Sequence, residues 1–219
     1  MSRTLSYSAC LGLIALCAFA LTTQAATDRA YVANFTSGTV SVVDTRTNAV
    51  IDTIAVGANP IGSAASPDGR RVYVTNINSN GVTVVDADAR SVLLTVMAGN
   101  GPNGVAVSPQ SDRVYVTNRS DHDVSVINAA TNTIIDTIAV GTNPFGVAVN
   151  PSGTRVYVAN IADGTMSVIN TATHMEIAAV TVGDTPADIA VSPDGNLIYV
   201  SNFGSNNVSV INANTLAVI

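Results

Sequence analysis

The sequence contains no tryptophan and no lysine, and its only two cysteines, Cys10 and Cys17, lie near the amino terminus. All nine basic side chains are arginines, against 15 acidic ones, and the formal net charge is −6. An acidic surface without lysine disfavours nucleic acid and anionic lipid as partners, because both are held largely through neutralised phosphates. No segment has the length and 3.6-residue period of an amphipathic helix, so we expect no helical domain.

Residues 1–25 have the layout of a secretory signal peptide. Arg3 supplies a positive start, Cys10–Leu21 is an apolar run, and Thr23–Ala25 offers small residues for cleavage. The apolar run is shorter than the roughly 20 residues that span a bilayer, which disfavours the alternative of a permanent membrane anchor. We therefore expect an exported protein, periplasmic or at the cell surface or extracellular, whose mature part is residues 26–219.

Cleavage after the signal peptide would remove both cysteines. The mature chain could then form no disulfide, attach no haem through a CxxCH motif and bind no metal through thiolates. Its remaining length suffices for one domain with a sizeable core, and no linker, charge run or change of composition divides it.

A repeat of 42 residues organises the mature chain. Its landmark is Arg113–Asn118 (RVYVTN), and similar stretches place tyrosines at this spacing. The repeat tyrosines are Tyr31, Tyr73, Tyr115, Tyr157 and Tyr199. A glycine and two prolines keep the same step, as in Gly141, Pro144 and Pro151. A fixed period of this size indicates structural units that bury their faces against their neighbours.

Each unit predicts four strands. In one unit they are Gly146–Asn150, Arg155–Asn160 and Thr165–Asn170, and the preceding unit shows the fourth at Thr133–Val140. These segments are rich in Val, Ile, Thr and Tyr between clusters of Gly, Pro, Asn and Asp. Strands such as Val114–Val116 are apolar on consecutive positions, so both of their faces must be covered. The sequence therefore predicts an all-β propeller of four-stranded blades, with a solenoid as the less suitable alternative.

The motifs also resemble a known family. VGxxPxG precedes YVTN, SPDG turns occur at Ser66–Gly69 and Ser192–Gly195, and Val140–Thr173 fits the pattern almost throughout. This set is similar to the YVTN-type β-propeller repeat family, and the resemblance covers the whole mature chain. It implies the propeller fold, whereas family members and relatives include surface-layer proteins, periplasmic binding proteins, lactonase-like enzymes and quinoprotein-dehydrogenase-like propellers.

Catalytic groups do not converge in the predicted blades. His122 lies in a loop between second and third strands and His174 in a turn between third and fourth strands, which places them on opposite faces. Lactonase-like relatives imply polar residues around the channel, where this chain has the single acid Asp188, and quinone-binding relatives imply a stacking tryptophan, which is absent. We predict no catalytic residue, no metal and no cofactor. The alternative is a lactonase-like hydrolase or a quinoprotein-dehydrogenase-like subunit acting at the channel mouth.

The most distinctive loop is 119–123. Arg119 stands where the other copies have Phe or Ile, and a solvated ion pair with Asp121 or Asp123 is its simplest explanation. The functional alternative is a patch on a scaffold that binds an envelope protein or a small ligand. Its predicted residues are Asn103, Arg119, Asp121, His122, Asp123, Phe145 and Asp188.

The mature chain holds about 4.6 repeats, whereas propellers have about four to eight blades. It begins at a second strand, around Tyr31, and stops at Ile219, which aligns with Ile51 inside a fourth strand. We expect the sequence to be part of a larger propeller, for example a seven-bladed one. The chain as given should then self-associate through exposed apolar faces.

Overall fold

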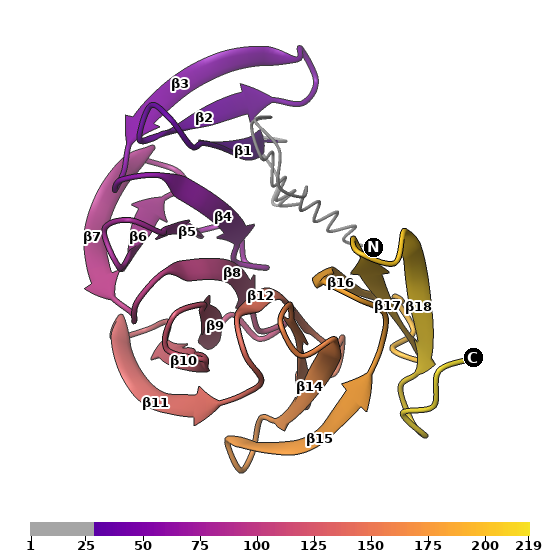
Figure 1. The fold of residues 1–219 in the computed structure, drawn as a ribbon. Coiled ribbons are helices and arrows are strands. Elements are labelled where there is room, and N and C mark those ends of the chain that lie inside the picture. Colours follow the sequence, from indigo (N-terminus) through magenta and orange to yellow (C-terminus); the bar gives the residue numbers. More distant parts are fainter. Residues whose placement is uncertain (1–28) are drawn as a thin grey trace.

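A computed structural model describes residues 29–219. This part of the chain forms 18 strands and no helix, in five antiparallel sheets that follow one another along an open arc (Figure 1). It accordingly contains no helix of the length and apolarity needed to span a membrane. The predicted signal peptide, residues 1–25, lies outside the described residues. The sheets are the blades of a partial β-propeller, as the sequence predicts.

Each blade is an up-and-down meander whose strands follow chain order. The first blade is β1 (Arg29–Asn34), β2 (Thr39–Asp44) and β3 (Ala49–Ala55); the second is β4 (Pro60–Ala65), β5 (Arg71–Asn76), β6 (Gly81–Asp86) and β7 (Ser91–Met97); the third is β8 (Pro102–Val107), β9 (Arg113–Asn118), β10 (Asp123–Asn128) and β11 (Thr133–Ala139); the fourth is β12 (Pro144–Val149), β13 (Arg155–Asn160), β14 (Thr165–Asn170) and β15 (Met175–Thr181); the fifth is β16 (Pro186–Val191), β17 (Leu197–Asn202) and β18 (Asn207–Asn212). Within residues 29–219 the first blade thus starts at the second-strand position, around Tyr31 as predicted.

The inner strands begin at the loop proline, two residues earlier than the sequence indicates. In β12, Pro144 pairs with Asn160 and Val147 with Val158, and the register shifts between these pairs. A bulge at residues 145–146 therefore lets the strand extend back to the proline. Neighbouring inner strands also lie close together, since a Cβ added at Gly104 would stand 2.2 Å from the Phe145 carbonyl oxygen.

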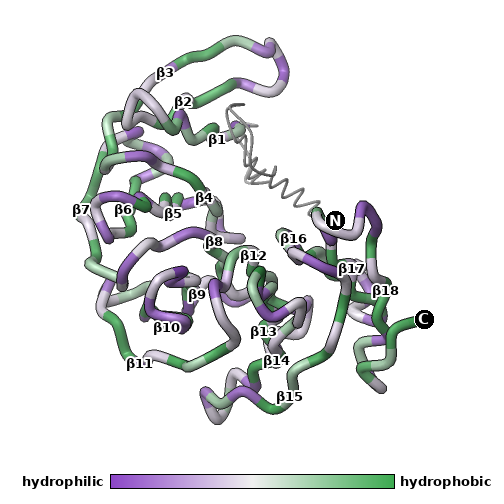
Figure 2. Tube along the Cα trace, in the orientation of Figure 1, coloured by the Kyte–Doolittle hydropathy of each residue, from purple (hydrophilic) through white to green (hydrophobic). Residues whose placement is uncertain are grey.

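The core lies between blades, so the second, third and fourth sheets are covered on both faces as predicted, while Tyr199 and Val208 of the fifth sheet are exposed. Between the third and fourth blades, Tyr115, Val124, Val126 and Ile138 pack with Val156, Val158 and Ile169. The tyrosines of the first four blades are 0–1% exposed. The outer strands β3, β7, β11 and β15 are mostly exposed and still carry apolar residues, visible along β7 in Figure 2. The main contacts between elements join strands of one blade or of adjacent blades.

Two landmarks of the repeat hold each other in place. The Asn76 side chain, fully buried at the end of β5, accepts a hydrogen bond from the Gly57 N–H at 3.0 Å and donates to Thr83 Oγ1 at 2.9 Å. A Cβ at Gly57 would lie 2.6 Å from Asn76 Cγ. The same close approach recurs between Gly141 and Asn160. The asparagine thus fixes the link between blades, and the glycine leaves room for it.

Candidate functional site

The seven predicted site residues belong to one of the two faces of the arc, which we call the loop face. It consists of the loops between second and third strands and of the links from an outer strand to the next inner strand. Residues 119–123 form the loop between β9 and β10, while Asn103, Phe145 and Asp188 lie near the starts of β8, β12 and β16. Pairing of Pro102 with Asn118 places the start of β8 beside this loop.

Asp121 ties its loop to the preceding link. Its carboxylate accepts hydrogen bonds from the Asn100 backbone N–H at 2.7 Å and from Asn100 Nδ2 at 2.8 Å. These bonds lower the pKa of Asp121 below its ordinary value. Asp163, one repeat later, accepts from the Thr142 N–H at 2.5 Å. In the second and fifth blades Ser79 and Ser205 accept the corresponding bond. The carboxylate of Asp121 therefore serves a role that a hydroxyl also fills.

His122 ties the loop to the following link. Its Nδ1 accepts a hydrogen bond from the Asn143 N–H at 3.1 Å, and its backbone has a φ of 61°. In the second blade, Asn80 accepts from the Gly101 N–H at 3.2 Å with a φ of 54°. Glycine or asparagine, which favour this left-handed conformation, fill the position in the other blades: Gly38, Asn80, Gly164 and Asn206. The imidazole therefore replaces an asparagine in a structural bond.

Asp123 supports the asparagine of the RVYVTN stretch. Its Oδ1 accepts a hydrogen bond from Asn118 Nδ2 at 2.7 Å, where the fourth blade uses Thr165 Oγ1 to accept from Asn160 at 3.1 Å. Burial raises the pKa of Asp123, and the hydrogen bond from Asn118 opposes this rise. The pKa values of Asp121 and Asp123, two residues apart, are thus shifted in opposite directions.

Arg119 is half-buried and differs from its neighbours in the loop. Its N–H donates to the Gly101 carbonyl at 3.0 Å, which holds the backbone. Among residues 29–219 its guanidinium forms no ion pair, so the expected pair with Asp121 or Asp123 is not present. Both carboxylates accept hydrogen bonds from asparagines instead.

The three inner positions differ in exposure. Asn103 and Phe145 are buried, at 3% and 4% exposure, and the Asn103 carbonyl accepts a hydrogen bond from Thr75 Oγ1 at 2.5 Å. Asp188 is half-buried and stands where three preceding blades have a glycine. Its N–H donates to Ser201 Oγ at 3.0 Å. The structure thus brings Arg119, Asp121 and His122 to the surface of the loop face and keeps Asn103 and Phe145 beneath it.

The two histidines occupy opposite ends of their blades, as predicted. His122 precedes β10, whereas His174 follows β14 and its Nδ1 lies 2.8 Å from Asp136 Oδ2 on the outer strand β11. This contact lowers the pKa of Asp136. In the part of the chain that the structure describes, no group of three or more His, Cys, Asp or Glu side chains could hold a metal ion.

Comparisons with known proteins identify the fold. A family model described as a YNCE-like beta-propeller matches residues 64–155. No curated protein sequence matches the chain. Among solved structures, 1518 chains match, so the fold itself indicates little about function. Together these matches support a β-propeller repeat family, while the YVTN-type assignment stays a prediction.

Two of these structures illustrate the likeness. A functionally unknown protein from Desulfotomaculum acetoxidans DSM 771 is similar with a TM-score of 0.75 and 18% identity, over 87% of this chain and 64% of that chain. Hydrazine synthase from Kuenenia stuttgartiensis is similar with a TM-score of 0.53 and 17% identity, over 89% of this chain and 95% of that chain. At such identities the likeness concerns the fold alone.

Proposed function

We propose that this β-propeller repeat protein is an exported scaffold that binds a protein or another envelope component through its loop face and catalyses no reaction itself. The observation that carries the proposal is the use of the polar side chains in loop 119–123. Asp121, His122 and Asp123 each accept a hydrogen bond that joins or supports neighbouring segments. Ser, Asn and Thr make the same bonds in other blades, so the chemistry of the three residues serves structure.

These bonds make the loop face a rigid platform. Asp121 joins the loop to the preceding link and His122 joins it to the following one, so the loop is held on both sides. Binding to a rigid surface loses less conformational entropy than binding to a mobile loop. Arg119 is the one cation in this loop and is unpaired among residues 29–219, and its planar guanidinium suits a carboxylate on a partner. An acidic surface group is therefore the expected contact.

A capture experiment from the envelope fraction of the native host tests this proposal. The full chain carrying Arg119→Glu should retain little partner, because charge reversal replaces attraction by repulsion, while its melting temperature stays close to that of the unchanged protein. The matched control is Arg46→Glu, which reverses an exposed arginine in the turn between β2 and β3. Equal loss of the partner in both variants would show that overall charge, and not the loop face, determines binding.

The rival proposal places a hydrolase or a cofactor-bearing subunit at the channel mouth. It rests on Asp188, whose carboxyl group stands where Gly62, Gly104 and Gly146 occur in other blades. A screen of the purified protein against lactones, with and without divalent metals, tests the hydrolase. Turnover that Asp188→Ala abolishes would overturn the scaffold proposal, and so would a visible absorption band in protein purified from the native host.

A further inference from the structure

A pocket of about 340 Å³ opens on the face of the arc opposite the loop face. We call this second face the turn face, because it is formed by the turns between first and second strands and between third and fourth strands. The pocket lies between the second and third blades. Its charged lining consists of Arg70, Arg71, Arg113, Asp68 and Asp112, and we call it the arginine pocket. Three of the nine basic residues of an acidic chain therefore gather at one place.

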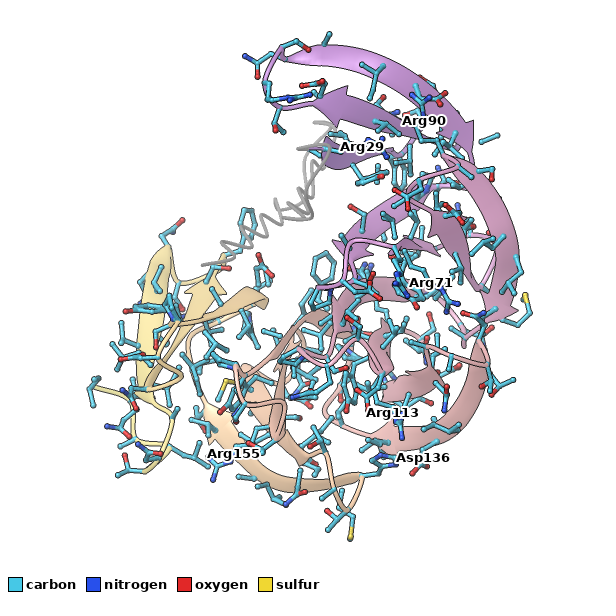
Figure 3. All side chains as sticks on the ribbon, turned by 180° about the vertical axis from the view of Figure 1, so that it is seen from behind. Arg29, Arg71, Arg90, Arg113, Asp136 and Arg155 are labelled. Carbon is cyan, nitrogen blue, oxygen red and sulfur yellow. The ribbon has the colours of Figure 1, made fainter. Side chains whose placement is uncertain are left out.

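One of these arginines, Arg113, makes a different contact from the equivalent arginines of the other blades. Arg29, Arg71 and Arg155 each donate to a carbonyl oxygen 58 residues later, on Ala87, Ala129 and Ala213. At the same spacing Arg113 would donate to the Thr171 carbonyl oxygen. Its Nη1 instead donates to the Asp112 carbonyl at 3.0 Å and lies 3.4 Å from Asp112 Oδ2. Figure 3 shows the four arginines recurring along the arc. Arg113 thus contributes its charge to the pocket and not to the next blade.

Arg70 adds a charge that the repeat does not require. Its side chain is exposed, and within residues 29–219 it takes part in no ion pair. A second pocket, between the fourth and fifth blades, shows the corresponding positions without this charge. There Thr154 replaces Arg70 and Leu197 replaces Arg113, so Arg155 is its only arginine.

The two carboxylates of the arginine pocket are already occupied by neighbouring donors. Asp68 Oδ1 accepts from Ser66 Oγ at 2.5 Å and from the Arg70 N–H at 3.1 Å. Asp112 Oδ1 accepts from Ser108 Oγ at 2.6 Å. These bonds stabilise the turns. With three arginines and two aspartates, the pocket has one more positive than negative side chain.

The Tyr73 hydroxyl is a further donor at this place. Tyr73 lines the pocket, is fully buried, and its hydroxyl has no hydrogen-bond partner among the described residues. Burial raises the pKa of Tyr73, and the nearby Arg71 guanidinium opposes the rise. In the first blade the equivalent Tyr31 hydroxyl donates to the Ala87 carbonyl at 3.3 Å. An unpaired buried hydroxyl is unfavourable, so an acceptor atom in the pocket would satisfy it.

We propose that the arginine pocket binds a small oxyanion, the carboxylate or phosphate group of a small molecule. Arg70 and Arg113 supply the charge and the paired N–H groups that match such oxygens, and the Tyr73 hydroxyl supplies a donor from below. The site lies on the face opposite to the proposed partner-binding loop, so it constitutes a separate function of the fold.

Isothermal titration calorimetry of the full chain with inorganic phosphate, with succinate and with chloride tests the proposal. Arg70→Thr and Arg113→Leu install the residues of the second pocket. Each should weaken binding about tenfold, the loss expected for one charge-assisted hydrogen bond. Arg46→Thr removes the same charge from another turn of this face and should leave binding unchanged.

The outcomes separate clearly. Binding of phosphate alone identifies a phosphate-bearing ligand, and binding of succinate alone identifies a carboxylate. If Arg113→Leu fails to fold, Arg70→Thr decides, because it changes only an exposed turn residue. Absence of binding of either anion at about 10 mM, or an equal loss with Arg46→Thr, would overturn the proposal.

Discussion

The hydrogen bonds of Asn76 allow a quantitative test of how the blades are joined. Asn76→Ala removes the acceptor of the Gly57 N–H and the donor to Thr83 Oγ1, which lie 3.0 and 2.9 Å from the amide. Two neutral hydrogen bonds contribute about 1 kcal/mol each, and a buried N–H left without an acceptor costs about 1 kcal/mol more. We expect the free energy of unfolding to fall by about 3 kcal/mol, which corresponds to roughly 6–12 °C in melting temperature for a chain of this size.

Urea denaturation followed by circular dichroism measures this change. Asn34→Ala is the matched control, because Asn34 is half-buried and donates to Thr39 Oγ1 at 3.0 Å and Ser41 Oγ at 2.8 Å. Among the described residues it meets no link glycine, so its loss should cost only about 2 kcal/mol, the contribution of its two hydrogen bonds. If Asn76→Ala costs no more than Asn34→Ala, the bond to the link does not stabilise the arc and the reasoning is refuted.

Three further predictions concern packing, titration and assembly. Gly104→Ala should destabilise the protein by about 1–3 kcal/mol, because the added carbon meets the Phe145 carbonyl oxygen; urea melts showing no loss would contradict this close approach. In an NMR titration, the carboxyl group of Asp121 should titrate below its ordinary pKa of 3.8 and that of Asp123 above it. Asp121 therefore contributes stability above pH 3.8 that is lost as the pH falls through its lowered pKa, whereas folding gains stability as Asp123 is protonated. Light scattering should show self-association through the face around Tyr199, which is 38% exposed, and Tyr199→Asp should reduce it; an unchanged assembly would exclude this face.

The sequence predicts most of the fold because the repeat makes each strand visible several times. The bounds of β13 and β14 agree with the prediction, since turn residues enclose them on both sides. The inner strand β12 was predicted to begin at Gly146, whereas it begins at Pro144. The reason is the bulge at residues 145–146, which interrupts the alternation of side chains and thereby conceals the paired proline.

The site was harder to predict, because unlike residues can fill one structural role. His122 and Asp121 look distinctive in the sequence, yet they accept the hydrogen bonds that Asn80 and Ser79 accept one blade earlier. The reverse applies to Arg113, which is the first residue of the repeat landmark RVYVTN and does not stand out in the sequence. Its place in the arginine pocket is seen only in the structure, where it lines the pocket and its guanidinium contacts Asp112. The sequence offers one sign of this difference in Thr171, which stands where the second, third and fifth blades have Ala87, Ala129 and Ala213.

Because the main contacts join strands of one blade or of adjacent blades, the repeat has a consequence for how genes of this kind change. Removal of residues 74–115 would attach Tyr73 to Val116, the equivalent of Val74, and every remaining blade would still meet a complementary neighbour. Unequal recombination in steps of 42 codons can therefore lengthen or shorten the arc without creating a foreign contact. A site within one blade survives such events, whereas the arginine pocket, which needs residues from two particular blades, is lost when either is exchanged.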